Sequence, residues 1–133
     1  MASDRSSRLV RLSRSDFAIE NFNEDVRGRH VLTIDGDRIG TVEDLLIDRE
    51  DQTVRFLQVG AGGFLGFGEH TWLIPIEAVR EVDEYQVLVD QSREHVAAAP
   101  LYNPHVVQTD PYLNDVYEHY GYRPPWVPGA ETT

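Results

Sequence analysis

The chain has 133 residues, the length of one ordinary domain, and its 41% hydrophobic and 26% charged residues are typical of a globular protein. Twelve basic residues, all arginine, stand against 23 acidic ones, and the resulting formal charge of −11 disfavours binding to nucleic-acid phosphates. The absence of cysteine and lysine excludes disulfides, thiol nucleophiles, cysteine-bound metals and Schiff-base chemistry.

The first 23 residues are predicted to form an arm outside the folded domain. Four arginines recur at every third position of a serine-rich stretch, at Arg5, Arg8, Arg11 and Arg14. In a helix these side chains would share one face, which suits contact with anionic lipid or with an acidic partner. Because the stretch holds few large apolar residues, the pattern favours a solvated terminus.

The next part of the chain, up to residue 90, carries the pattern of short β-strands joined by turn residues. Asp35-Gly36-Asp37 is typical of a tight turn, and Gly40 indicates a bulge or a sharp bend inside a strand. Pro75 is expected to open a one-turn connection to the last strand. Strands this short and this closely spaced predict a small barrel or a curled antiparallel sheet. The expected strands are 31–34, 39–47, 53–59, 71–74 and 85–89.

Helical signals begin only after residue 90. Ser92 is a candidate N-cap for a short, alanine-rich helix over 93–99. Asp110-Pro111 is typical of a helix start, and the helix that follows is expected to end at Gly121. The apolar side chains of this second helix recur at helical spacing and include several aromatics, so they should share one face.

Three stretches of the β segment share a family pattern. They are Asp25–Asp48, in which an Asp-Gly turn precedes Ile-Gly-Thr-Val, the strand 54–59, and the Leu-Ile-Pro return within 73–79. Together they resemble the PRC-barrel family, named after the cytoplasmic domain of the photosynthetic reaction-centre H subunit. The resemblance implies a mainly β fold: a small, five- to six-stranded antiparallel PRC-type β-barrel with short C-terminal helices. The chain then divides into an arm at 1–23, a barrel at 24–90, and a helical extension with a proline-rich tail at 91–133.

The glycine-rich loop at 60–68 invites a nucleotide-binding interpretation. The dinucleotide fingerprint G-x-G-x-x-G requires glycine where Leu65 stands, and the next element is a predicted strand rather than a helix. We therefore predict a hairpin loop. Its large apolar residues Phe64, Leu65 and Phe67 are expected either to fold back onto the barrel or to meet a second subunit.

The aromatic residues of the C-terminal helix could stack on nucleic-acid bases or dock onto a protein surface. Base stacking is disfavoured because the chain is strongly acidic and only Arg123 lies nearby in sequence. The apolar helix face is instead expected to dock onto its own barrel or onto the barrel of another chain. The candidate contact residues are Tyr112, Val116, Tyr117 and Tyr120.

No grouping of residues in the sequence indicates catalysis. The acids between residues 35 and 51 fall mostly in predicted turns and lack the order of a calcium loop, so solvated carboxylates are favoured over a hydrolase pair. The histidines show no metal-ligand spacing. They are His30, His70, His95, His105 and His119. We predict a protein that is not an enzyme and that binds neither a metal nor a cofactor.

The sequence and the resemblance favour a non-enzymatic PRC-barrel protein that acts as a protein-interaction module. A barrel of about 65 residues has a small core, and a homodimer would bury the apolar area that one barrel leaves uncovered. The alternative that the resemblance implies is a peripheral accessory of a membrane electron-transfer or photosynthetic complex. Because no apolar run reaches the ~18–20 residues of a membrane span, and no secretion signal is visible, we expect a cytoplasmic protein, free or peripheral to the inner membrane.

Overall fold

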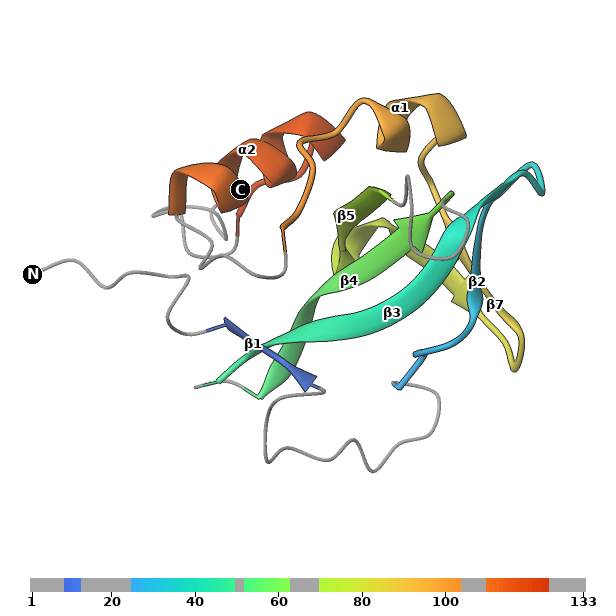
Figure 1. Ribbon diagram of the computed structural model, residues 1–133, viewed down its shortest axis with the longest axis horizontal. Helices are drawn as coiled ribbons and strands as arrows, with labels where there is room; N and C mark the ends of the chain where they lie inside the picture. The colour runs from blue at the N-terminus through green and yellow to red at the C-terminus, as the bar shows by residue number, and fades with distance from the viewer. Residues whose placement is uncertain (1–8, 13–24, 50–51, 63–69, 104–109, 125–133) are drawn as a thin grey trace, which may run out of the picture.

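The computed structural model describes residues 9–12, 25–49, 52–62, 70–103 and 110–124. These residues form a mainly β molecule with two α-helices, as predicted (Figure 1). The strands are β1 (Leu9–Arg11), β2 (His30–Thr33), β3 (Arg38–Asp48), β4 (Thr53–Ala61), β5 (His70–Pro75), β6 (Val79–Val82) and β7 (Gln86–Val89). A 3-10 turn, η3 (Ile76–Ala78), links β5 to β6, and the helices are α1 (Arg93–Ala97) and α2 (Asp110–Tyr120).

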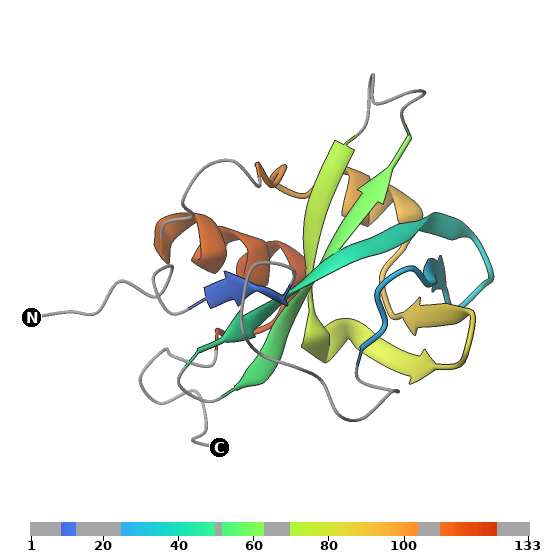
Figure 2. The ribbon, with the colours of Figure 1, turned by 60° about the horizontal axis from the view of Figure 1, so that its bottom comes forward.

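The strands form one curled sheet in the order β5-β4-β3-β2-β7-β6, and β1 pairs with β3 beside this path (Figure 2). All strand pairs are antiparallel except β2 and β7, which run parallel with Val31 opposite Val87. The predicted mainly β fold of five to six strands is confirmed, and among the described strands this pair is the departure from the predicted antiparallel pairing. Four antiparallel pairings lie between β2 and β7 along the chain, and an even number of reversals leaves the two strands running in the same direction. One of the four is the hairpin between β6 and β7, and β6 is a strand that the sequence pattern missed. Within the described residues, β5 and β6 end the sheet without pairing to each other, so the barrel is not closed.

The curl of the sheet comes from irregularities along β3, its longest strand. The pairing register shifts between Val31 and Leu32 on the β2 side and between Val42 and Asp44 on the β4 side. Such bulges bend a strand and increase its twist. Gly40 lies at the first of them, and a Cβ there would overlap the carbonyl oxygen of Gly60 on β4. The predicted bend at Gly40 is thus confirmed, and its physical cause is the close approach of two backbones.

The N-terminal residues 9–12 depart from the predicted solvated arm. β1 pairs with the C-terminal part of β3, with Val10 opposite Ile47, and Leu12 is buried. Arg11 therefore lies on a strand, so the helical basic face is wrong at this position. Its apolar neighbours Leu9 and Leu12 pack against the core, which is the reason that the segment docks. Arg5, Arg8 and Arg14 lie outside the described residues.

Helix α2 lies across the sheet of its own chain (Figure 1). This is one of the two docking surfaces expected for its apolar face. The ring of Tyr117 packs on Phe56 of β4 with ring centroids 5.1 Å apart, and Val116 and Tyr120 are buried in the same core. The helix docks on its own sheet. As predicted, it ends at Gly121, whose φ of +81° is costly for other residues. The predicted cap of α1 is also present, because Ser92 accepts a hydrogen bond from the backbone N–H of His95 at 3.0 Å.

Candidate functional site

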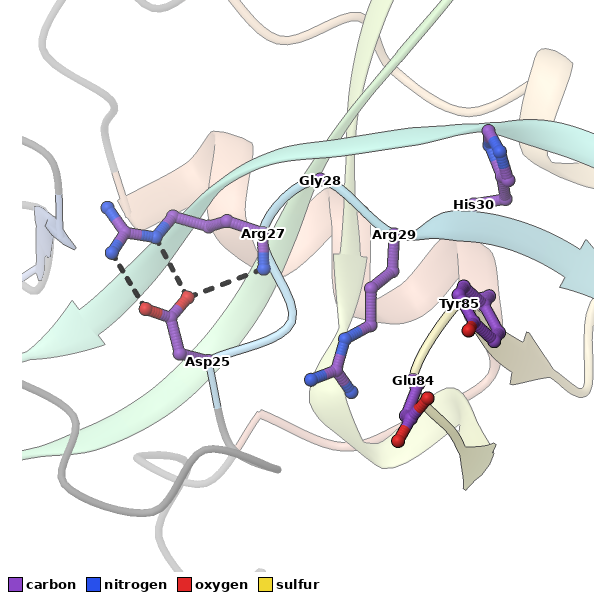
Figure 3. Close-up of a pocket in the computed structure, with 7 residues that line it drawn as sticks. All are labelled: Asp25, Arg27, Gly28, Arg29, His30, Glu84 and Tyr85. Carbon is purple, nitrogen blue, oxygen red and sulfur yellow. Dashed lines mark hydrogen bonds and ion pairs between the residues drawn. The ribbon is translucent and has the colours of Figure 1, made fainter.

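A cleft of about 700 Å³ opens where the chain enters β2, beside the β6–β7 turn (Figure 3). We call it the Tyr85 cleft. It combines backbone, charged and aromatic groups from two segments that are far apart in the sequence. Its lining residues are Asp25, Arg27, Gly28, Arg29, His30, Glu84 and Tyr85.

The backbone of the cleft is held by a turn at Gly28 and by hydrogen bonds to both neighbouring strands. Gly28 has a φ of +89°, a conformation that costs little only for glycine. Its N–H donates to the carbonyl oxygen of Val42 at 2.8 Å, and the N–H of Val42 donates to the carbonyl oxygen of Arg29 at 2.9 Å. On the other side, the N–H of His30 donates to the carbonyl oxygen of Tyr85 at 3.0 Å. The two walls of the cleft are therefore fixed relative to each other.

A bidentate ion pair holds the guanidinium of Arg27 at one rim of the cleft. Its Nε and Nη2 atoms donate to the two carboxylate oxygens of Asp25 at 2.8 and 2.7 Å, as Figure 3 shows. The hydrogen bonds from Arg27 hold the pKa of the Asp25 carboxyl below its ordinary value and raise the pKa of Arg27. Both side chains remain partly exposed, so we expect the pair to orient Arg27 more than to stabilise the fold.

Arg29 contributes a second guanidinium, from a residue that is only 5% exposed. Its Nη1 donates to the carbonyl oxygen of Asp83 at 2.8 Å, which ties the wall at β2 to the β6–β7 turn. The Asp83 carboxylate in turn accepts from the backbone N–H groups of Tyr85 and Gln86 at 2.8 and 2.9 Å, a local bond typical of aspartate in turns. In Figure 3 the Arg29 side chain extends between the Asp25–Arg27 pair and Glu84. The cleft thus carries fixed charges of both signs.

Tyr85 is the large apolar residue that lies exposed at this site. Its residue is 74% exposed, and Val82 at the end of the same turn is 39% exposed. Tyrosine and arginine are the residue types most enriched at the centres of protein interfaces, because they combine apolar area with directional polar groups. The arrangement suits recognition of another protein surface.

The residues predicted as a partner surface lie elsewhere. Phe64, Leu65 and Phe67 fall outside the described residues. Val116, Tyr117 and Tyr120 are covered by the chain's own sheet, so in the folded chain they do not offer a free surface to a partner, contrary to one of the two expectations. The physical reason is that β4 and β5 present an apolar face within reach of α2 in the same chain.

Tyr112, the fourth predicted contact of this helix, is partly buried. It stacks on Tyr102 with ring centroids 6.4 Å apart, and its hydroxyl donates to the carbonyl oxygen of Pro100 at 3.4 Å. This side chain therefore also serves the attachment of α2 to its own chain.

The carboxylates singled out in the sequence do not converge on one point. Asp35, Asp37 and Glu43 are exposed, as expected for solvated acids. Asp44 and Asp48 are buried on β3, which corrects their interpretation as solvated acids. Asp44 accepts from the backbone N–H of Leu45 at 2.9 Å, and Asp48 lies 3.9 Å from Nε of Arg55. The two are four steps apart along the strand, about 13 Å, which is too far for a hydrolytic carboxylate pair.

Among the described residues, no group of three or more histidine, aspartate or glutamate side chains is placed to hold a metal ion. Within the same residues, no helix combines the length and the apolar character needed to cross a membrane.

Sequence reasoning did not single out the Tyr85 cleft. The available signals were weak: an Arg-Gly-Arg sequence at 27–29, and an aromatic residue in a polar turn between two strands. Neither signal says that the two segments meet, because the contact depends on the parallel pairing of β2 with β7.

Comparison with known families gives a match over most of this molecule. The model of the PRC-barrel domain matches residues 19–96. The matched range covers more than half of the 133 residues and extends from the segment before the Tyr85 cleft into α1.

Proposed function

Because this chain belongs to the PRC-barrel family, we propose that it is a non-enzymatic docking module that associates with a second copy of itself through the Tyr85 cleft. The observation that carries the proposal is the 74% exposed ring of Tyr85 at the rim of a cleft that also holds two arginines. An aromatic side chain in this position loses little conformational freedom on binding and buries a large area.

The charges of the cleft favour a second copy as the partner. Arg27 and Arg29 stand beside Asp25 and Glu84, so the patch carries both signs. In a two-fold dimer the same patch meets itself, and a patch with both signs can place the exposed Arg27 of one copy against the exposed Glu84 of the other. A patch of one sign would repel its own copy.

Strand addition at the exposed edge of β6 is a less suitable route for association. This edge strand has four residues, contains Arg80 and Glu81, and shifts register against β7 between Val79 and Glu81. Short length, charge and a bulge are the features by which natural sheets keep an edge from pairing with another chain. Side-chain docking at the neighbouring turn avoids this obstacle.

Sedimentation equilibrium of the full chain over a dilution series tests the proposal. We expect the wild type to reach about twice the monomer mass of 15.2 kDa, and Tyr85→Ser to weaken the dimer by about tenfold or more. Ile34→Ser is the matched control, because Ile34 is also an exposed apolar turn residue, at 65%, but does not line the cleft. A wild type that stays at 15.2 kDa throughout, or equal weakening by the two substitutions, would contradict the proposal.

A further inference from the structure

A second cleft, of about 550 Å³, lies where the β2–β3 turn, the close approach of β3 to β4 and the start of α1 come together. We call it the Thr41 cleft, after a residue of β3 that lines it. Helix α1 packs beside β3 at this end of the sheet (Figure 1). The residues that line the Thr41 cleft are all different from those that line the Tyr85 cleft, so the two sites can be tested separately.

Part of the wall of the Thr41 cleft is backbone without side chains. Gly40, Gly60 and Gly62 all line it. At Gly40, β3 and β4 approach so closely that a Cβ would overlap the carbonyl oxygen of Gly60. Gly62 follows β4 with a φ of +76°, a conformation that costs little only for glycine. Because no side chain projects from these three positions, a ligand can approach the backbone closely there.

The cleft holds two arginines that form no ion pair. Arg38 begins β3, Arg93 begins α1, and both residues are exposed. Arg27, by contrast, forms the bidentate pair with Asp25 described above. In the described part of the chain, neither Arg38 nor Arg93 pairs with a carboxylate, and Nη2 of Arg38 donates to the hydroxyl of Thr41 at 3.3 Å. The two guanidiniums therefore keep donors available for a ligand.

Carboxylates line the same cleft without contacting these guanidiniums. Asp37 lies exposed in the β2–β3 turn, and Glu43 lies on β3, where it accepts a hydrogen bond from Nε2 of Gln58 at 3.4 Å. Across the described ranges, no charged group of this cleft is ion-paired to another. The cleft thus offers donors for an anion and acceptors for a cation at separate places.

The character of the lining favours a small polar ligand over a protein surface. Protein interfaces are built around exposed aromatic and large apolar residues, and those that the described chain exposes lie outside this cleft. They are Ile34, Val82, Tyr85 and Leu101. A phosphate or another multiply charged anion is disfavoured, because the two carboxylates of the cleft repel it. A ligand with one negative and one positive group matches both kinds of charge.

We propose that the Thr41 cleft binds a small zwitterion of the amino-acid class, in which a carboxylate and an ammonium group are a few atoms apart. Arg38 and Arg93 donate charge-assisted hydrogen bonds to the ligand carboxylate, and Asp37 accepts from its ammonium group. The part of the ligand between the two groups lies against the glycine backbone of β3 and β4. This activity is separate from the docking proposed for the Tyr85 cleft.

Nuclear magnetic resonance of the full chain at low salt tests the proposal, with amide chemical shifts followed during titration. The probes are glycine, β-alanine and γ-aminobutyrate, in which the two charges are increasingly far apart. Acetate, ethylammonium and inorganic phosphate serve as comparisons. We expect shifts at the amides of Thr41, Gly60 and Gly62. The best of the three amino acids should bind at least about tenfold more tightly than any comparison ion.

Substitution of the exposed charges identifies the contacts. Arg38→Gln and Arg93→Gln should each weaken binding of the best probe by about tenfold. Asp37→Asn should remove the advantage of that probe over acetate, because the acceptor for the ammonium group loses its charge. Arg49→Gln is the matched control: Arg49 is also exposed, in the turn after β3, but does not line the cleft, so this variant should bind as the wild type does.

Three results would overturn the proposal. The first is the absence of shifts at the cleft for all three amino acids at millimolar concentration. The second is acetate or phosphate binding as tightly as the best probe, which would show a simple anion surface. The third is equal weakening by Arg49→Gln and the two cleft variants. Tyr85→Ser should leave probe binding unchanged, so failure of this site and failure of the dimer are distinguishable.

Discussion

The two halves of the curled sheet differ in how much of each strand is covered. In the long-strand half, formed by β3, β4 and β5, Phe56, Leu57 and Val59 are fully buried although they point to alternate faces of β4. In the short-strand half, formed by β2, β6 and β7, only every second residue of β2 and β7 is buried. Val82 at the end of β6 and Tyr85 in the β6–β7 turn are exposed by 39% and 74%. The comparison teaches that this small domain concentrates its core on one side and leaves the other side free to present side chains.

The cause of the difference is α2. It covers one face of the long-strand half, while the curl of the sheet covers the other face (Figure 1). No described helix covers the outer strand β6, where Arg80, Glu81 and Val82 are all exposed. Buried area per residue is what stabilises a domain of this size, so the two halves should respond very differently to substitution.

The largest expected effect is the loss of the α2 contact. Tyr117→Ala removes a ring that is fully buried against Phe56, and we expect a loss of about 3–5 kcal/mol in the free energy of unfolding. Tyr85→Ala deletes a ring of the same kind from the short-strand half and, at a dilution at which the chain is monomeric, should change the free energy by no more than about 0.5 kcal/mol. Urea unfolding followed by circular dichroism measures both. Equal losses for the two tyrosines would show that the halves do not differ in this way.

A smaller effect is expected where the long strands approach most closely. Gly40→Ala would bring a methyl group into the carbonyl oxygen of Gly60 and within 3.0 Å of Val59, so backbone must move, at a cost of about 1–3 kcal/mol. Gly36→Ala is the control in the β2–β3 turn: it meets no atom within 4 Å and is strained only by its φ of +95°, at about 1 kcal/mol. Thermal unfolding of the two variants should rank them in this order. The reverse order would show that the backbone conformation at Gly36 restricts substitution more than the close approach of β3 and β4 at Gly40.

The smallest effect concerns Glu77 in η3, which joins the two halves. Burial raises the pKa of the Glu77 carboxyl above its ordinary value of 4.5, an effect that the charge of Arg55 partly offsets. One of its oxygens is buried without a hydrogen-bond partner among the described residues. A raised pKa in the folded state means that this group favours folding at low pH and that the benefit is lost as pH rises through the folded-state pKa.

Glu77→Gln should therefore raise the unfolding midpoint slightly at about pH 7, and the gain should vanish below about pH 3.5, well under the ordinary value of 4.5, where the carboxyl is protonated in both states. Midpoints of variant and wild type across this range measure the effect. Glu81→Gln, at an exposed residue of β6, provides the control and should give no such pH-dependent gain. A Glu77→Gln variant that is less stable than the wild type at neutral pH would contradict the expected sign.

Much of the fold could be predicted from local pattern. The turn at Asp35-Gly36-Asp37, the cap at Ser92 and the helix end at Gly121 are each determined by a few neighbouring residues, and the structure has them as expected. β1 and β6 could not be found in this way. Each has three or four residues and gains its strand conformation from pairing with β3 or β7 rather than from its own sequence.

The candidate site was less accessible to sequence reasoning than the fold. The Tyr85 cleft joins Arg27 and Arg29 to a turn more than 50 residues further along the chain, through the bond from Arg29 to the carbonyl of Asp83. The contact between the stacked rings of His95 and His119 likewise joins two residues with sequence separation 24. The local sequence around these histidines and turn residues does not indicate that they form such contacts.

The sequence by itself determined the family, the mainly β class, the position of most strands and turns, and the aromatic face of the last helix. These properties depend on alternation, helical spacing and the backbone preferences of glycine, proline and aspartate, all of which act over a few residues. Tertiary structure alone decided that β7 runs parallel to β2, that α2 covers its own sheet, and which exposed side chains come together. Those outcomes depend on which apolar faces bury each other most completely, and that is a property of the whole chain.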